Sequence, residues 1–246
     1  MHLIKQTLHP ILLAAIVIGA GGFSARGAGP GEVSGITEPF MDVTLGLADA
    51  GIIREEFFKE GDALKKGDVI LELDKNLEAL EVQRRKAVMD QNQMVLESTR
   101  RLSETTKSVS KEALGKAEAE YNVAAAAYGI AVQQLANRQL AAPFSGSIAE
   151  IVLKPGAACA PYQPLVHLAD TSRCYFIGHL EGVAAANWRL DEPVKIEVAG
   201  GQTVSGRVCF ISPVVDAASG LVRVKAVFDN ADGKVRPGLA AKMTPE

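Results

Sequence analysis

The stretch Gly51-Ile-Ile-Arg-Glu-Glu-Phe-Phe-Lys-Glu-Gly61 returns 95 positions later as Gly146-Ser-Ile-Ala-Glu-Ile-Val-Leu-Lys-Pro-Gly156. At this one offset, seven positions are identical between residues 51 and 73, and apolar residues recur at four more. Such self-similarity indicates an internal repeat. Each copy has the pattern of a strand, a glycine turn and a second strand, so we predict structural turns at four glycines: Gly51, Gly61, Gly146 and Gly156.

One copy of the repeat is too short to bury its own apolar face, because an isolated pair of strands is at best marginally stable. We therefore predict that two halves, residues 35–73 and 141–170, pack on each other as one split β domain. The segment between the halves must then leave this domain as an extension.

That segment, residues 74–140, has a helical period. In its second arm, seven residues alternate at spacings of three and four, as in the a and d seam of a coiled coil: Leu114, Ala117, Tyr121, Ala124, Tyr128, Ala131 and Leu135. The first arm is less regular, and its apolar residues form two rows: Leu77, Leu80, Ala87 and Met94, flanked by Val88, Val95 and Leu102. Asp74 is a plausible N-cap for the first helix, and the polar stretch 103–110 is expected to break the helix in the middle.

We predict an antiparallel coiled-coil hairpin inserted into the split β domain. The alternative is a pair of ordinary core helices, but the many alanines and charges suit a narrow seam better than a broad core. Function is expected at the hairpin tip, in four partner-binding residues: Arg100, Arg101, Leu102 and Ser110. A partner that buries Leu102 would gain apolar burial, and the arginines would pair with carboxylates or carbonyl groups. The alternative is that Leu102 is simply the last seam residue.

Residues 171–246 are again rich in strand patterns. We predict strands at 175–181, 193–198, 202–211, 222–227 and 238–243, and a short helix at 182–188. Several short strands separated by turn signals favour a small closed or nearly closed β-barrel. The whole chain is thus predicted to be an elongated protein of mixed α and β structure.

The N-terminus predicts the compartment. Lys5 precedes an apolar run at residues 11–22 and then small residues up to Ala28. This pattern is typical of a secretory signal peptide over residues 1–28, with an uncleaved signal anchor as the alternative. Without Lys5 and Arg26 the formal charge changes from −3 to −5, which gives no reason to expect nucleic-acid binding.

Catalytic and metal-binding patterns are missing from the sequence. It has no Ser/His/Asp order, phosphate loop or zinc signature, so we expect neither enzymatic activity nor a cofactor. Cys159, Cys174 and Cys209 lack metal-like spacing. They are interpreted as small buried hydrophobes, with a disulfide between Cys174 and Cys209 as the open alternative.

Three motifs in a fixed order carry a family resemblance. Glu60-Gly-Asp-Ala-Leu-Lys-Lys-Gly-Asp-Val-Ile-Leu-Glu-Leu-Asp74 precedes the hairpin, and Ala142-Pro-Phe-Ser-Gly-Ser-Ile148 follows it. The third is the pair of tail segments 206–216 and 235–243. Together they resemble the periplasmic adaptor subunits, also called membrane fusion proteins or HlyD-like proteins, of tripartite efflux pumps, particularly those of the resistance-nodulation-division type.

The resemblance implies a lipoyl-like split domain, a coiled-coil hairpin and a β-barrel. It further implies a periplasmic protein, associated with the inner membrane, that links an inner-membrane transporter to an outer-membrane TolC-type channel and assembles into a ring of six copies. Alternatives are an adaptor of an ABC-type exporter or type I secretion system, and a structural envelope coiled coil. A lipoyl- or biotin-carrier domain would need its modified lysine in a tight turn, whereas the nearest candidate, Lys75, opens a long helix.

Overall fold

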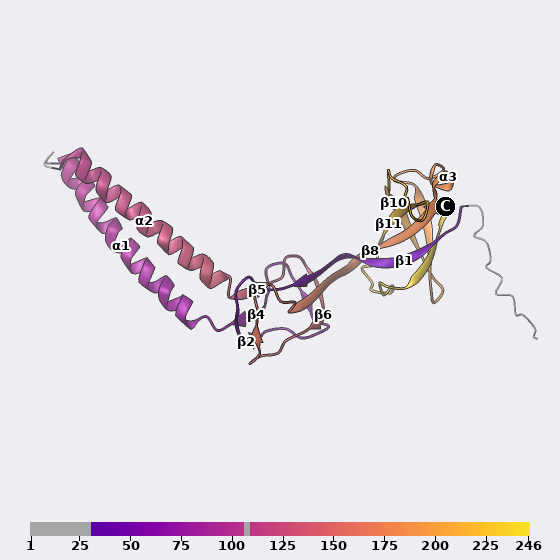
Figure 1. The fold of residues 1–246 in the computed structure, drawn as a ribbon, viewed down its shortest axis with the longest axis horizontal. Helices are drawn as coiled ribbons and strands as arrows, with labels where there is room; N and C mark the ends of the chain where they lie inside the picture. Colours follow the sequence, from indigo (N-terminus) through magenta and orange to yellow (C-terminus); the bar gives the residue numbers. More distant parts are fainter. Residues whose placement is uncertain (1–30, 106–108) are drawn as a thin grey trace, which may run out of the picture.

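The computed structural model describes residues 31–105 and 109–246. The predicted signal segment, residues 1–28, lies outside the described residues. The molecule is a rod of three parts: a helical hairpin at one end, a small β domain in the middle and a β-barrel at the other end (Figure 1). The predicted fold class is confirmed.

The secondary structure alternates between short strands and one long helical excursion. The helices are α1 (Asn76–Thr105), α2 (Lys111–Ala136) and α3 (Gly182–Ala185). The strands are β1 (Val33–Leu45), β2 (Gly51–Glu56), β3 (Ala63–Leu64), β4 (Val69–Leu73), β5 (Gln139–Ala141), β6 (Gly146–Ile151), β7 (Ala158–Cys159), β8 (Val166–Glu181), β9 (Pro193–Val198), β10 (Gln202–Ile211), β11 (Leu221–Asp229) and β12 (Ala240–Pro245).

The split β domain is built by exchange between the two copies of the repeat. Strand β2 of the first copy pairs with β7 of the second, and β6 of the second pairs with β3 of the first. Two backbone hydrogen bonds that the repeat makes equivalent have the same length: Gly61 N donates to Ile148 O at 2.8 Å, and Gly156 N donates to Ile53 O at 2.8 Å. The two halves are therefore interlocked around a pseudo-two-fold axis, as the repeat predicted.

The core of this domain draws on both halves. Ile53 is 1% exposed and its repeat partner Ile148 is 2% exposed. Leu73 and Leu168, the last repeat pair, are fully buried in the same cluster. Neither half has a separate core, because these side chains pack on one another across the pseudo-axis.

Two of the four predicted turn glycines are corrected. Gly61 and Gly156 lie in turns, with φ of 90° and 91°, a conformation that side chains with a Cβ rarely adopt. Gly51 and Gly146, in contrast, begin strands β2 and β6. Glycine is needed at these two positions for close packing: a Cβ on Gly146 would lie 2.5 Å from the carbonyl oxygen of Ala169.

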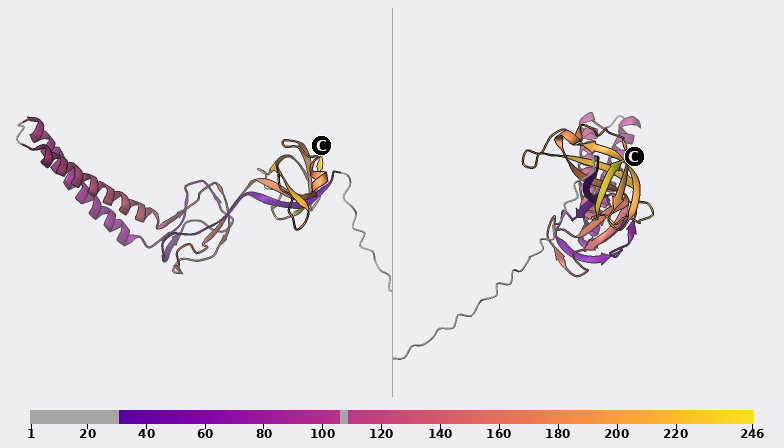
Figure 2. Two further views of the ribbon diagram at one scale, coloured as in Figure 1. Left: turned by 45° about the horizontal axis from the view of Figure 1, so that its top comes forward. Right: turned by 90° about the vertical axis from the view of Figure 1, so that its right-hand side faces the viewer.

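The barrel has six strands in the order β1, β12, β9, β10, β11 and β8, and pairing of β1 with β8 closes it. The strands curl into a closed barrel at this end of the molecule (Figure 2). The buried apolar core of the barrel contains Phe176, Ile196 and Met243. Trp188, just after α3, is 7% exposed and belongs to that core.

The position of β1 corrects the predicted domain boundary. Residues from 35 onward were assigned to the split domain, but Val33 pairs with Met243 and Gly35 pairs with Gly178, so the start of β1 belongs to the barrel. The strand continues into the split domain, where Leu45 pairs with Val166. Strands β1 and β8 thus pass through both β domains and form the ribbon that joins them (Figure 1).

Side chains just before both long helices accept hydrogen bonds from the first turn. Asp74 accepts a hydrogen bond at 3.1 Å from the amide of Asn76, but α1 begins at Asn76 and Ala79 N donates to Lys75 O, so Lys75 occupies the N-cap position that was predicted for Asp74. Ser110 caps α2 by accepting at 3.0 Å from the amide of Ala113. Among the described residues, neither long helix combines the length and hydropathy that a membrane crossing requires.

The seam between the helices is narrow, and α2 contributes more buried residues to it than α1 does. On α2 the buried residues are Ala117, Ala124 and Ala131, and the other four predicted seam residues are half-buried on the same face: Leu114, Tyr121, Tyr128 and Leu135. On α1 the apolar rows were assigned to the wrong face. The side turned to α2 carries Glu78, Val82, Arg85, Met89, Asn92, Leu96, Thr99 and Ser103, of which only Leu96 is buried. Apolar contact on this side comes from Val82, Met89 and Leu96, which alternate with polar residues, and the aliphatic stem of Arg85 can add to it.

Candidate docking site at the hairpin tip

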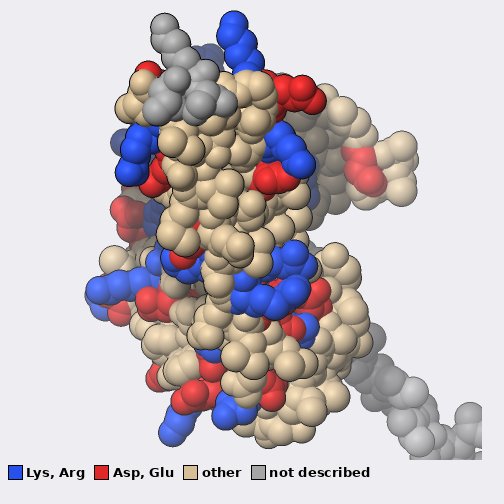
Figure 3. Space-filling view, turned by 90° about the vertical axis from the view of Figure 1, so that its left-hand side faces the viewer, with Lys and Arg blue, Asp and Glu red and all other residues tan. Residues whose placement is uncertain are grey.

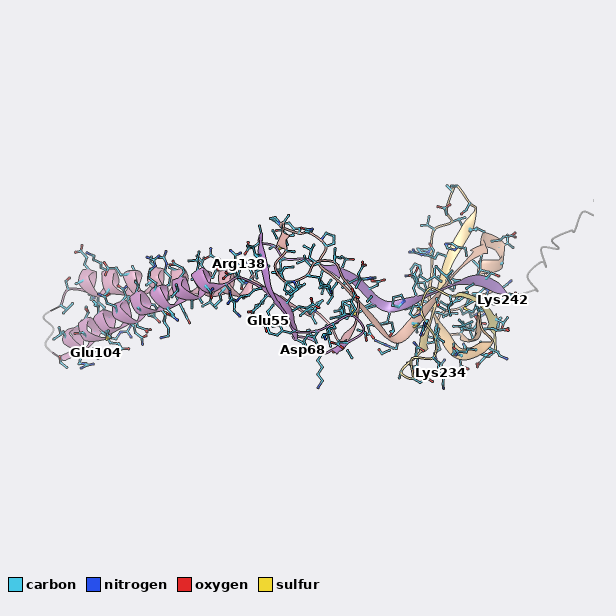
Figure 4. All side chains as sticks on the ribbon, turned by 90° about the horizontal axis from the view of Figure 1, so that it is seen from below. Glu55, Asp68, Glu104, Arg138, Lys234 and Lys242 are labelled. Carbon is cyan, nitrogen blue, oxygen red and sulfur yellow. The ribbon has the colours of Figure 1, made fainter. Side chains whose placement is uncertain are left out.

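The four predicted tip residues lie at the ends of α1 and α2 that meet at the tip of the hairpin. This is the end farthest from the barrel, where Figure 4 labels Glu104. Arg100, Arg101 and Leu102 belong to the last turns of α1, and Ser110 precedes α2. The connecting residues 106–108 lie outside the described residues.

The structure assigns these residues two different roles. Arg100 Nη2 donates to Glu118 Oε1 at 3.0 Å and so ties α1 to α2, while the Ser110 hydroxyl caps α2. Arg101 is exposed, and Leu102 is 46% exposed. Arg100 and Ser110 therefore shape the tip, and Arg101 and Leu102 are the pair presented to solvent.

Charges of both signs surround the tip. Seen from the hairpin end, basic and acidic side chains are interleaved around broad uncharged areas (Figure 3). Such a mixed surface exerts no long-range field of one sign.

Sequence reasoning missed the residue that holds the hairpin to its base, Arg138 (Figure 4). Its Nη2 pairs with Glu78 of α1 at 2.6 Å, and its Nη1 donates to the carbonyl of Ala50 at 2.8 Å. Its own carbonyl accepts from the amide of Leu73 at 2.8 Å. One side chain thus joins the hairpin to the split domain, and the only sequence signal was its place immediately after the second helix.

We expect Arg138→Met to destabilise this junction by about 3 kcal/mol, because it leaves a mostly buried Glu78 carboxylate unpaired. Arg138 and Glu78 are 21% and 20% exposed, so solvent screens the pair only partly. Urea denaturation followed by circular dichroism measures the change. The matched control is Arg84→Met, since Arg84 pairs with Glu81 on the exposed hairpin surface. Removing this exposed pair should leave the urea denaturation curve unchanged. Equal effects of the two substitutions would show that Arg138 has no special role.

The position of Lys75 argues against a carrier domain. Its ammonium group is paired with Glu72, and that contact is the main cause that lowers the pKa of the Glu72 carboxyl. Lys75 lies between the end of β4 and the start of α1. A lysine that must be presented at a tight turn for modification would be free of such a partner.

The remaining chemical candidates are structural. Cys174 is buried and contacts Asn230, and burial raises the pKa of its thiol to about 11. Cys209 is exposed, so the prediction of three buried cysteines is wrong for this residue. All three cysteines are free thiols, so the alternative disulfide is not formed. Among the described residues, no group of three or more His, Cys, Asp or Glu side chains is placed to hold a metal ion.

Comparisons with known proteins agree with this architecture. Residues 182–246 match the family model "CusB-like, beta-barrel domain". Over 237 residues the chain is 25% identical to "Multidrug resistance protein MdtE" of Escherichia coli strain K12, a match that covers 85% of this chain and 62% of that protein. The chain spans 56% to 62% of the length of the curated relatives that it matches over most of its own length.

Two solved structures show the same fold. One is a chimera of MacA and MexA that contains the Pseudomonas aeruginosa MexA α-hairpin domain, with a TM-score of 0.76, 17% identity and coverage of 87% of this chain and 78% of that chain. The other is the membrane fusion protein Spr0693 of Streptococcus pneumoniae R6, with a TM-score of 0.69, 17% identity and coverage of 87% and 98%. The C-terminal part of the chain is therefore similar to the CusB-like β-barrel domain, and the chain as a whole has the same fold as Spr0693 and the MacA–MexA chimera.

Proposed function

We propose that this protein is a periplasmic adaptor that links an inner-membrane transporter to an outer-membrane TolC-type channel for efflux or export of small molecules. The proposal is supported by the separation of two structurally different ends, a helical hairpin and a barrel that includes the CusB-like segment 182–246, by the split domain between them (Figure 1). A helix of 30 residues, the length of α1, spans about 45 Å. A bridging protein needs such reach.

The barrel end is assigned to the transporter and the tip to the channel. At the tip, Leu102 supplies an exposed apolar side chain and Arg101 an exposed cation, on a frame fixed by Arg100 and Ser110. We propose a ring of six copies on the resemblance to the family, and the periplasmic face of the inner membrane as its location. Repetition around a ring raises the combined strength of weak tip contacts through effective concentration.

Leu102→Asp is expected to abolish efflux while the protein remains folded. Burying one leucine contributes roughly 1.5–3 kcal/mol, and a carboxylate at the same place opposes docking in every copy. The measurement is drug resistance or export in cells, beside a thermal melt and transporter co-purification of the purified variant.

The matched control is Leu77→Asp, in the first turn of the same helix, where the leucine is 78% exposed and an acidic residue suits the helix N-terminus. Transport should survive this change. Transport that survives Leu102→Asp, or a loss accompanied by unfolding, would show that the tip is not the docking element.

Two alternatives remain distinguishable by experiment. An adaptor of an ABC-type exporter or type I secretion system would co-purify with an ATP-hydrolysing transporter instead of a proton-driven one. A purely structural envelope coiled coil would co-purify with neither. The match of residues 182–246 to the CusB-like β-barrel domain supports the resistance-nodulation-division class.

A further inference from the structure

The barrel has a cavity at the mouth farthest from the hairpin, beside α3 (Figure 1). Its volume is about 550 Å³, and its walls come from the start of β1, the end of β8, the start of β11 and residues 184–192. Small molecules commonly bind in cavities of a few hundred Å³, including those in the mouths of β-barrels. The barrel interior is filled by its own apolar side chains, so a ligand has room at the mouth and not within the barrel.

The wall of this cavity carries negative charge. Among the described residues that line it, the charged ones are all acidic, with no lysine or arginine: Glu32, Glu181 and Glu192. The remaining titratable residue of the wall is His179. Glu181 makes no ion pair with a described residue, and Glu192 uses one oxygen to accept from the amide of Arg189 at 2.9 Å. A concave surface lined by one sign of charge concentrates ions of the opposite sign.

Cations close to the wall leave two of these carboxylates available. Lys242 pairs with Glu32 at 2.7 Å and so neutralises the third. Arg223 on β11 is engaged with an aromatic ring, since its Cζ lies 5.8 Å from the centre of Phe210. Arg189 is exposed and does not line the cavity. The charge that a ligand meets is therefore that of the other two carboxylates.

A tryptophan supplies much of the apolar wall. Trp188 is 7% exposed and lines the cavity together with Val33, Leu180 and Leu221. No described residue accepts a hydrogen bond from its indole N–H, and that nitrogen is not sealed from solvent. A nearly buried side chain rarely leaves a donor unpaired, so the edge of the indole is available to a ligand. The face of a tryptophan ring also attracts cations.

These features select an organic cation over a metal ion, an anion or a neutral molecule. The carboxylates do not converge, because no group of three or more His, Cys, Asp or Glu among the described residues is placed to hold a metal ion. The wall would repel an anion, and a neutral apolar molecule would desolvate the carboxylates without pairing them. We propose that the barrel mouth binds an apolar organic cation, with Glu181 and Glu192 beside its charge and Trp188 against its apolar body.

The first test is a titration of the purified protein with tetraphenylphosphonium, an apolar organic cation. Trp188 is the only tryptophan of the chain, so its fluorescence reports on this cavity alone. We expect a saturable change in that fluorescence, and added salt should weaken the binding. The matched control ligand is tetraphenylborate, an anion of nearly the same size and shape, which should bind at least about 10-fold more weakly. Equal affinities for the two ions, or fluorescence that does not change, would overturn the proposal.

The second test changes the wall. The double variant Glu181→Gln and Glu192→Gln keeps the shapes of both side chains, and the glutamine oxygen at position 192 can still accept from the amide of Arg189. We expect its affinity for tetraphenylphosphonium to fall roughly 10-fold, with an unchanged thermal melt. The control is Glu197→Gln, because Glu197 is exposed on β9 of the same barrel and does not line the cavity. This control should bind as the unaltered protein does.

Undiminished binding by the double variant would show that the two carboxylates do not hold the ligand and would contradict the proposal. Both tests use the purified protein alone, so their outcome does not depend on the proposed transport function.

Discussion

Replacing residues 74–137 with an Asn-Gly turn is expected to leave both β domains folded while it removes the whole hairpin. Strands β4 and β5 already run antiparallel, with Glu72 opposite Gln139 and the amide of Leu73 bonded to the carbonyl of Arg138. That geometry is the one a two-residue Asn-Gly hairpin closes. The free energy of unfolding of the β domains, measured by thermal unfolding followed by near-ultraviolet circular dichroism, should change by less than about 1 kcal/mol.

The physical reason is that the hairpin contributes little to the split-domain core. The apolar cluster of that domain draws on residues 47–73 and 140–168 and none from α1 or α2. Loss of cooperative unfolding in the shortened protein would mean that the helices are needed to hold the two halves together, and the interlocked-repeat account would be wrong.

The second large effect concerns the pseudo-symmetric core. Ile53→Ala and Ile148→Ala are each expected to destabilise the split domain by about 3–4 kcal/mol, since both remove a fully packed side chain and leave a cavity. The two values should agree, because equivalent strands surround the two residues. Urea titration of each variant measures the free energy of unfolding.

A neighbouring residue supplies the control. Ile52 is 57% exposed, so Ile52→Ala should change the free energy of unfolding by less than about 0.5 kcal/mol. Limited proteolysis adds a second readout: because the halves are interlocked, either core substitution should expose both halves to cleavage. Cleavage confined to the substituted half would show that the halves fold separately.

The sequence predicted the split domain because its pairing follows the repeat. Gly51 opposes Cys159 just as Gly146 opposes Leu64, so one offset of 95 positions relates both the residues and their partners. The barrel strands β9 and β10 were also predicted with the bounds that the structure shows. In such segments the local alternation of apolar and polar residues, together with the turn residues, is enough to predict the strand and its bounds.

Other features escaped prediction because no local pattern encodes them. Strand β1 completes the barrel by pairing with Met243, more than 200 residues away, and no turn marks where it passes from one domain to the next. The α1 seam includes Glu78, Arg85 and Asn92, so a search for apolar periodicity selected the outer face instead. The role of Arg138 depends on partners from two other elements, Glu78 and Ala50.

The most direct test of the adaptor account is co-purification after crosslinking in cells, comparing the full chain with the variant whose residues 74–137 are replaced. The account predicts that the full chain retains both an inner-membrane transporter and an outer-membrane channel. The shortened variant should retain the transporter, through its intact barrel, and lose the channel. A shortened protein that still captures the channel, or a full chain that captures neither membrane protein, would contradict the assignment of the two ends.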